Sequence, residues 1–395
     1  MLSRYLRYGC SERFPYVDNS EITDLTYHEI KDQLNDLITE AIRKINPLNT
    51  VFQLSGGFDS SVVVSHFKGV DTFCTGDENS LDRTYSAKVS KEFGTNHTWM
   101  SHTSLLSEID FKKTVIEMAS INRHPRCFKN DFGLFAFLKY IKEHADRVVG
   151  GKGIEFQMLG YCTIYNRILE HAIGIGEYSV GKAESYLLKR TVNSTKDMML
   201  FNVQNVLESY RNPTHYSLNH VDWWTGTFDM KDVERLTYTK QKDHSFDNFT
   251  EIVDFIFEWF GREYIDNRLE DYGNYFGIEC ANPYMDDEVV RFIKTIPVEM
   301  KKCMNHHKYI FYEAMAHKVP GYIVERPKEG LNTSLSYFES HEDDITELVA
   351  EYLLDKSMKI YNHIDYDELQ SVMMNFNKTW MLLNLSIWME HNASN

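Results

Sequence analysis

The sequence predicts an α/β fold, in which a twisted, largely parallel sheet carries helices on both faces and is followed by a mostly helical C-terminal half. Short apolar runs alternate with helical patterns up to about residue 150, and strands that alternate with helices are typical of an open parallel sheet. One of these runs leads directly into a glycine-rich turn and a further helix. From about residue 171 onward the strand signals fade, and from about residue 250 the pattern is mainly helical, broken at prolines.

The expected elements follow one another at short intervals. Apolar residues recur at helical spacing over about 27–45, where Thr26 provides an N-cap and Pro47 ends the helix. The strand candidates are 51–54, 70–75, 97–100 and 147–149. The helical patterns that alternate with them are 62–67, 80–93, 104–120 and 131–144. The polar, tyrosine-rich stretch that starts at about residue 171 is interpreted as an irregular, partly helical insertion.

Composition narrows the classes of function. The chain of 395 residues has 42 basic and 58 acidic residues and a net charge of −16, which argues against a sequence-independent grip on nucleic-acid phosphates. No apolar stretch has the length of a membrane span, and the first residues lack the apolar core of a signal peptide. The six cysteines are scattered and form no CxxC pair. We therefore expect a cytoplasmic protein with free thiols and without a structural zinc site.

The strongest chemical signal is the turn SGGFDSS at residues 55–61, between a strand candidate and a helix. Gly56 and Gly57 permit a tight turn and a close approach of the backbone to a ligand. The hydroxyl groups of Ser55, Ser60 and Ser61 join the free N–H groups at the start of the helix. Such a nest of donors suits a polyphosphate.

The acidic residue in this turn needs a separate explanation. Asp59 alone would repel a phosphate, but it fits the site if it holds Mg²⁺ that bridges to phosphate oxygens. The alternative interpretation is a glycine turn with an N-capping serine. The segment is neither a Walker A loop, which ends in Gly-Lys-Ser/Thr, nor a GxGxxG dinucleotide fingerprint.

The same segment resembles the PP-loop of the ATP pyrophosphatases. It reads Ser55-Gly56-Gly57-Phe58-Asp59-Ser60. That group contains the asparagine, GMP, NAD and argininosuccinate synthetases, tRNA-thiolating enzymes, and the β-lactam and carbapenam synthetases. The PP-loop by itself does not separate these members from one another.

Four further blocks resemble the synthetase domain of asparagine synthetases. The block where the family binds adenine matches Thr75-Gly76, Asp82, Ala87, Gly94 and His97. The second ATP segment, SGEGxDE…GGY in the family, matches Val148-Val149-Gly150-Gly151-Lys152-Gly153-Ile154-Glu155 and Gly160-Tyr161. The block G-x-E-x-R-x-P-F-L-D and a later proline match Gly277-Ile278-Glu279, Asn282-Pro283-Tyr284-Met285-Asp286 and Pro297. The block K…LP…R-x-K-x-G matches Lys308, Pro320, Arg326, Lys328, Glu329 and Gly330. With a last helix around Trp380 to Trp388, the resemblance spans about residues 28–391.

The resemblance implies ATP and Mg²⁺ as cofactors and assigns residues to them. Asp59 and Glu155 match the acids that bind Mg²⁺ with the ATP phosphates, Glu155 standing where the family usually has Asp. As an alternative, Glu155 is a solvated acid at a helix start. The residues implied in nucleotide binding are Leu54, Ser55, Gly56, Gly57, Asp59, Ser60, Ser61, Thr75, Gly150, Gly151 and Gly153.

Two lysines are the catalytic candidates. Lys328 matches the lysine that offsets negative charge as the α-phosphate is attacked, although a lone lysine is more often a surface residue. Lys152 stands where asparagine synthetases have Glu and ring-closing relatives have Tyr, near the acyl-adenylate. It either acts as a base or pairs with a substrate carboxylate, or else the amide-forming half-reaction is altered or lost.

The implied activity is that of an ATP-dependent carbon–nitrogen ligase. It would adenylate a small-molecule or peptide carboxylate, release pyrophosphate, and transfer the acyl group to ammonia or an amine, with AMP as the other product. The alternatives are a ring-closing amide synthetase of the β-lactam synthetase type and a non-catalytic, nucleotide-binding descendant. We expect no full glutaminase domain, because the roughly fifty residues before the PP-loop are too few for one. Nitrogen would then come from ammonia, a substrate amine, or a separate glutaminase or biosynthetic partner.

The resemblance also suggests how the chain is divided. Residues 1–27 form an N-terminal extension, and residues 28–170 form the PP-loop ATP-binding core. Residues 171–260 form the insertion, which we expect to help determine the substrate, and residues 261–395 form the helical C-terminal part of the synthetase domain. We expect neither a membrane nor a nucleic acid among the partners.

Overall fold

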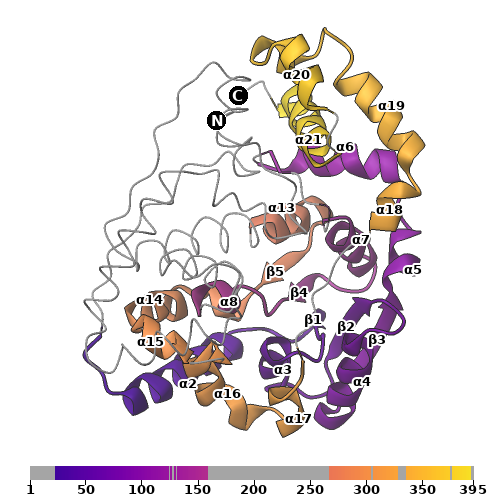
Figure 1. Cartoon of the computed structure of the whole chain (residues 1–395). Coiled ribbons are helices and arrows are strands. Elements are labelled where there is room, and N and C mark those ends of the chain that lie inside the picture. The colour runs from indigo at the N-terminus through magenta and orange to yellow at the C-terminus, as the bar shows by residue number, and fades with distance from the viewer. Residues whose placement is uncertain are drawn as a thin grey trace.

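The core of the protein is a five-stranded parallel sheet with the strand order β3-β2-β1-β4-β5 (Figure 1). The computed structural model describes residues 23–123, 125–126, 129, 131–158, 267–303, 306–327, 335–373 and 376–392. The strands are β1 Thr50–Gln53, β2 Asp71–Gly76, β3 Asn96–Ser101, β4 Arg147–Val149 and β5 Glu279–Ala281. The predicted α/β class and the parallel sheet are therefore confirmed.

The apolar side chains of the central strands point alternately to the two faces of the sheet, which explains why helices cover both faces. Val51 of β1 and Val148 of β4 are paired in register and pack into one buried apolar cluster. Their neighbours Phe52 and Val149 pack into a second buried cluster. Because successive side chains of a strand point to opposite faces, two adjacent apolar residues supply one contact to each cluster. Such doubly buried strands are typical of parallel sheets.

One face carries the helices that lie closest to the glycine-rich turn. They are α2 Tyr27–Arg43, α3 Phe58–Val64, α4 Leu81–Phe93, α14 Asp287–Thr295 and α16 Tyr309–Met315. The predicted first helix is confirmed with its cap: Thr26 accepts from the Glu29 N–H, and Glu29 accepts from the Thr26 N–H. The helix at 80–93 is likewise confirmed, with Ser80 as N-cap and Gly94 in the left-handed conformation that ends it.

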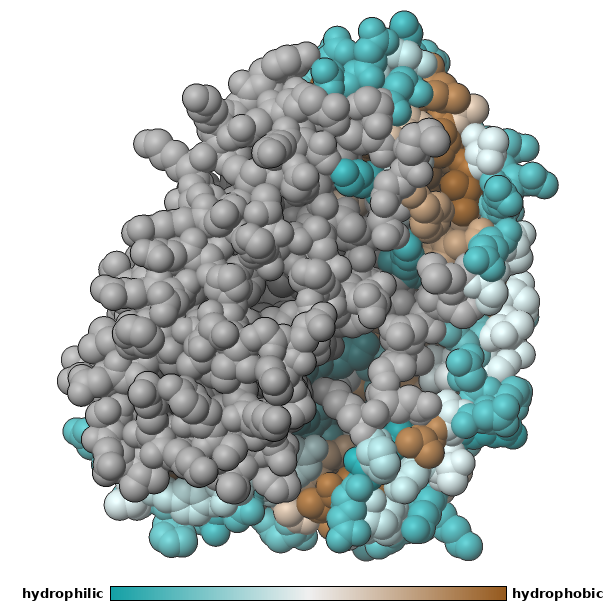
Figure 2. Space-filling model, in the orientation of Figure 1, coloured by the Kyte–Doolittle hydropathy of each residue, from teal (hydrophilic) through white to brown (hydrophobic). Residues whose placement is uncertain are grey.

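The opposite face carries a thicker layer. Its inner helices are α5 His102–Leu106, α6 Phe111–Ile121, α7 Asp131–Ile141 and α13 Asn267–Phe276. Outside them lie α18 Leu335–Glu339, α19 Glu342–Tyr352, η5 Lys359–Asn362, α20 Tyr366–Val372 and α21 Phe376–Asn392. Figure 2 shows hydrophobic residues in a strip at the upper right, where Figure 1 places α6, α19 and α21, with hydrophilic residues on either side.

Short elements complete the described part of the chain. They are α8 Ile154–Gln157, η3 Pro283–Met285, α15 Val298–Lys301, η4 Ala316–Lys318, α17 Gly321–Val324, and the antiparallel pair β6 Lys302–Cys303 and β7 His306–His307. Among the described residues, no helix combines the length and the apolar character needed to cross a membrane. The N-terminal extension up to residue 22 and the predicted insertion at 171–260 lie outside the described residues.

Three sequence-based expectations need correction. The helical pattern at 104–120 forms two helices, because Asp110 caps a new helix by accepting from the Lys113 N–H at 2.7 Å. The helix expected at 62–67 begins earlier, at Phe58. Strand β5 was not predicted, since its three residues, Glu279-Cys280-Ala281, form no apolar run. It nevertheless pairs with β4 in parallel and extends the sheet.

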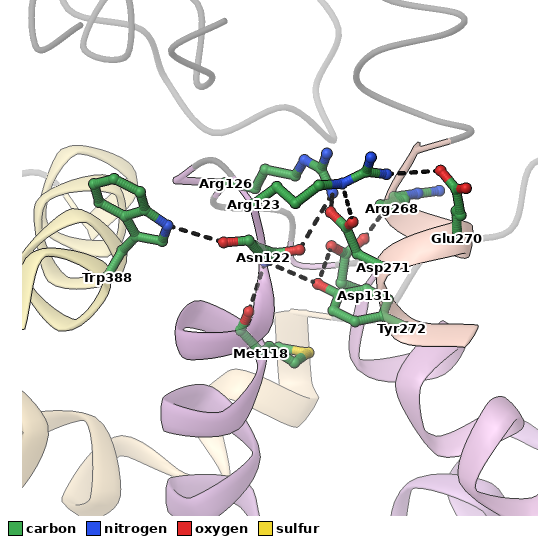
Figure 3. A network of polar contacts seen from close by, with 10 residues as sticks. All are labelled: Met118, Asn122, Arg123, Arg126, Asp131, Arg268, Glu270, Asp271, Tyr272 and Trp388. Atoms are coloured by element: carbon green, nitrogen blue, oxygen red, sulfur yellow. Dashed lines mark hydrogen bonds and ion pairs between the residues drawn. The ribbon is translucent and has the colours of Figure 1, made fainter. Parts of the chain in front are cut away.

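A buried network of charged side chains joins α6, α7, α13 and α21 (Figure 3). Asp271 accepts from Arg126 at 2.7 Å and from Arg123 at 2.5 Å. Asp131 accepts from Arg268 at 2.5 Å and from the Tyr272 hydroxyl at 2.7 Å. The Trp388 indole of α21 donates to the backbone oxygen of Asn122, whose side chain accepts from Arg126. Each buried carboxylate therefore has donors from two different side chains.

Candidate active site

The SGGFDSS turn lies at the carboxyl end of the central strand β1, between β2 and β4. Ligands of open parallel sheets bind outside this edge. Gly56 has φ of 67°, and a Cβ there would lie 2.4 Å from the carbonyl carbon of Tyr85. Gly56 is therefore needed for the turn to pack against α4. Within the turn, the Ser55 hydroxyl accepts from the Gly57 N–H at 3.2 Å.

The second predicted ATP segment packs directly on this turn. It follows β4, and a Cβ on Gly151 would lie 3.3 Å from the Cα of Ser60. The backbone oxygen of Lys152 accepts from the side-chain amide of Asn282, just after β5, at 2.8 Å. The fold thus brings together segments that follow β1, β4 and β5.

Lys152 itself is exposed, and its neighbour Gly153 is buried at the start of α8 with φ of 99°. This positive φ explains why a glycine stands before the helix. The role expected for the Lys152 side chain stays a prediction.

Asp59 is paired with a lysine from a distant part of the chain. Both of its carboxylate oxygens accept from the Nζ atom of Lys308, at 2.5 and 2.7 Å. The Lys308 side chain is 6% exposed and the Asp59 side chain 22%. Sequence reasoning placed Lys308 only in a family block and assigned it no partner, because 249 residues separate the two.

Besides burial, the charges of both predicted metal-binding acids raise the pKa of the same tyrosine, Tyr284. The hydroxyl of Tyr284 donates to the backbone oxygen of Asp59 at 2.7 Å. Burial raises the pKa of Tyr284 well above its usual value, and the negative charges of Asp59 and Glu155 raise it further. Tyr284 therefore stays protonated and can act as a donor. Glu155 also accepts from the Gly153 N–H at 2.9 Å.

Two hydroxyl groups near the turn have unmet hydrogen-bonding capacity. Among the residues that the structure describes, the Oγ atom of Ser61 and the Oγ1 atom of Thr75, at the end of β2, are buried and have no hydrogen-bond partner. Buried polar atoms are normally paired, so both are suited to a polar ligand. Leu54 is fully buried, and its N–H donates to the backbone oxygen of Phe73 at 2.9 Å. Its part in nucleotide binding stays a prediction.

The residues present fit a nucleotide with a metal ion. Asp59 and Glu155 would hold Mg²⁺, which in nucleotide sites is usually bound by one or two carboxylates and by phosphate oxygens. Over the residues that the structure describes, no group of three or more His, Cys, Asp or Glu side chains is placed to hold a metal ion.

Arg326 is a site residue whose role sequence reasoning left open. Its guanidinium forms an ion pair with Asp82, donates to the Ser55 backbone oxygen at 3.0 Å, and lies 4.9 Å from the centre of the Tyr85 ring. These contacts fix Arg326 beside the turn. Lys328, two residues later, lies outside the described residues. Asp82 and Arg326 each belong to a family block identified in the sequence, but the sequence did not show that the two side chains pair.

The comparison with protein families agrees with this arrangement. The family model described as asparagine synthase matches residues 29–390. That range includes the turn, the segment after β4, Lys308 and Arg326. No curated protein matches the chain. Because the match covers most of the sequence, the chain belongs to the asparagine synthase family, whose members are in general ATP-dependent ligases.

Proposed function

We propose that the protein is an ATP-dependent ligase that activates a carboxylate as its adenylate, releases pyrophosphate, and forms an amide with ammonia or an amine. One observation carries the proposal beyond the family match. Asp59 and Glu155 come from segments that follow β1 and β4, and these segments pack on each other, since a Cβ on Gly151 would lie 3.3 Å from the Cα of Ser60 and Glu155 accepts from the Gly153 N–H. Two acids at this edge suit Mg²⁺ bound with phosphates.

The first half-reaction follows from the groups around the turn. Ser61 and Thr75 supply hydroxyl groups with unmet hydrogen bonds, and within the turn the Ser55 hydroxyl bonds to the Ser60 hydroxyl and the Gly57 N–H. A carboxylate oxygen attacks the α-phosphorus of ATP, and the bond to the pyrophosphate oxygen breaks. Bound Mg²⁺ would neutralise charge on the phosphate oxygens.

Lys328 is the proposed cation that offsets the charge gathered on the leaving pyrophosphate. The support for this role is its position two residues after Arg326, whose guanidinium donates to the Ser55 backbone oxygen. A fixed cation of this kind acts mainly on the transition state, because the charge develops as the bond breaks.

In the second half-reaction the amine attacks the acyl carbon, loses a proton, and AMP leaves. Lys152 belongs to the loop that lies between the turn and Asn282. A protonated lysine cannot take this proton. We propose that Lys152 pairs with a negatively charged group of the substrate, so that its charge selects the carboxylate.

The experiment that tests the function incubates the protein with ATP, Mg²⁺ and a panel of carboxylates, with and without ammonia or amines. With ammonia or an amine, we expect AMP and pyrophosphate in equal amounts, only when a suitable carboxylate is present. Binding of ATP without pyrophosphate from any acid would favour a non-catalytic, nucleotide-binding role. Formation of ADP and phosphate would contradict the proposed chemistry.

A further inference from the structure

The short turn η3, which follows β5, contacts both of the segments to which the proposed function assigns chemistry. On one side, the hydroxyl of Tyr284 donates to the backbone oxygen of Asp59 at 2.7 Å. On the other side, the side-chain amide of Asn282, the N-cap of η3, donates to the backbone oxygen of Lys152 at 2.8 Å. One turn therefore holds the main chain of the acid implied in metal binding and that of the loop implied in amide formation.

Tyr284 is fixed by contacts on several sides. It is fully buried, and its ring packs edge-to-face on that of Phe311, with 5.5 Å between the ring centres. Its backbone oxygen accepts from the side-chain amide of Gln157 at 2.8 Å, in the helix that carries Glu155. A hydroxyl held in this way also holds its acceptor, because the backbone of Asp59 cannot shift without breaking a buried hydrogen bond.

Asn282 uses the two ends of its side-chain amide for two purposes. Its oxygen accepts from the Tyr284 N–H at 3.3 Å and so shapes η3. Its nitrogen is the donor to Lys152, in a loop whose neighbouring Gly153 has φ of 99°. Because such a backbone conformation is uncommon, a hydrogen bond from outside the loop helps to select it. The donor of Asn282 therefore fixes the loop, and its acceptor fixes the turn that carries Tyr284.

We propose that Tyr284 and Asn282 are positioning residues for the two half-reactions. Tyr284 sets the backbone of Asp59 for adenylation of the carboxylate, and Asn282 sets the Lys152 loop for attack of the amine on the adenylate. This inference rests on the proposed function, which supplies the two half-reactions. Neither side chain exchanges a proton or makes a covalent bond. Alignment of reacting groups contributes strongly to rate, so each contact should affect a different step, although the two residues stand in one turn.

The first measurement isolates adenylation by omitting the amine. Single turnovers with ATP, Mg²⁺ and a carboxylate that supports the reaction are quenched, and the pyrophosphate formed is measured. Tyr284→Phe removes only the hydroxyl and should slow this step about tenfold, while the ATP concentration that gives half the maximal rate stays the same. Asn282→Ser keeps an N-capping oxygen and loses the amide donor, so it should slow the step by about twofold at most.

The second measurement follows the fate of the adenylate. Ammonia or an amine is added once the adenylate has formed, and the amide is compared with the carboxylate that returns when water attacks instead. Asn282→Ser should lower the ratio of amide to returned carboxylate about tenfold, because a displaced loop no longer aligns the amine. Tyr284→Phe should leave this ratio within about twofold of the wild-type value, since both products arise from the same adenylate.

Two control variants lose matched hydrogen bonds far from the turn. Tyr272→Phe loses a buried hydroxyl that donates to Asp131, also at 2.7 Å, on the opposite face of the sheet. Asn384→Ser loses a side-chain amide that donates to the backbone oxygen of Trp380, also at 2.8 Å. Both should lower the temperature of unfolding and change neither the adenylation rate nor the amide ratio. Controls that reproduce the effects of Tyr284→Phe and Asn282→Ser would show general destabilisation and overturn the inference.

The possible failures are distinguishable. If the wild-type protein forms no pyrophosphate with any carboxylate, the proposed function fails and this inference fails with it. If the wild-type protein forms pyrophosphate and amide, but the two variants change rate and ratio by the same factors or leave both unchanged, the function stands and only the inference is overturned. Tyr284→Met and Asn282→Asp replace a variant that does not fold.

Discussion

The protein contains two clusters of buried charge that are built differently. In the network of Figure 3, Asp271 and Asp131 each accept from two side chains, which tie together helices of one face. At the glycine-rich turn, Asp59 has the side chain of Lys308 as its partner at both oxygens, and the hydroxyl groups of Ser61 and Thr75 have unmet hydrogen bonds.

If Asp59 holds the metal ion as proposed, this difference separates structural charges from functional ones. A carboxylate with two donors, both on another segment of the fold, cannot change partners without disturbing both of them. A carboxylate with one flexible partner, beside polar groups without partners, can exchange that partner for a ligand. Buried ion pairs are weak evidence of net stabilisation by themselves, so the number and origin of the partners are the more informative features.

The largest effect should come from Asp59→Asn, which removes the negative charge and nearly keeps the shape. We expect carboxylate-dependent pyrophosphate formation to fall by at least about a thousandfold, because charge stabilisation by a metal ion contributes several kcal/mol. Asp71→Asn is the control, since Asp71 is exposed at the start of β2. Near-normal turnover in folded Asp59→Asn protein would show that Asp59 is not an essential metal ligand.

In the network, Asp271→Ala should act on stability and not on the chemistry. Arg126 is 1% exposed at its side chain and would lose its ion pair with this carboxylate. We expect the free energy of unfolding to fall by about 3–5 kcal/mol, measured by denaturant titration. Glu270→Ala is the control, because the exposed Arg123–Glu270 pair should contribute under about 1 kcal/mol. Equal small losses in both variants would refute the structural role of the network.

Arg326→Ala should have a smaller effect on catalysis than Asp59→Asn. It removes the ion pair to Asp82 and the bond to the Ser55 backbone, so the segment that leads to Lys328 loses its anchor. We expect kcat to fall by about tenfold to a hundredfold. Arg326→Lys should restore only part of it, since lysine lacks the planar fork that serves two acceptors. Full recovery with lysine would mean that charge alone matters.

The smallest expected effect is on the pH dependence of stability, and it comes from two buried thiols, Cys74 near the turn and Cys280 against α13. Burial, with a lesser contribution from Asp82, raises the pKa of Cys74 from 9.0 to about 12, and burial likewise raises that of Cys280 to about 12. Between pH 9 and 12 the unfolded state therefore holds fewer protons than the folded state, so the free energy of unfolding should decrease as the pH rises through this range.

The same two thiols report on ligand binding. At pH 8, iodoacetamide should modify both slowly, and ATP with Mg²⁺ should slow the modification of Cys74 further while leaving Cys280 unchanged. Cys74 lies beside Asp82, the partner of Arg326, whereas Cys280 lies against α13. Site-resolved mass spectrometry measures both rates. Equal protection of the two thiols would contradict a ligand site confined to the turn.

What the sequence allowed us to predict was local. The first helix, its N-cap at Thr26, and the turn after β1 are encoded by neighbouring residues. Strand β5 was missed because its three residues have no distinctive pattern. The partners of Asp59 and Asp82 lie 249 and 244 residues away, and only the folded chain brings these side chains together.

The most direct test of the account follows the oxygen atoms of the carboxylate. A carboxylate that supports pyrophosphate formation is labelled with ¹⁸O, and the products are analysed by mass spectrometry and ³¹P NMR. If the carboxylate attacks the α-phosphorus of ATP at the turn after β1, one labelled oxygen must appear in AMP once the amide has formed, and Asp59→Asn must abolish this transfer. Label in inorganic phosphate, unlabelled AMP, or undiminished transfer in Asp59→Asn would contradict the account.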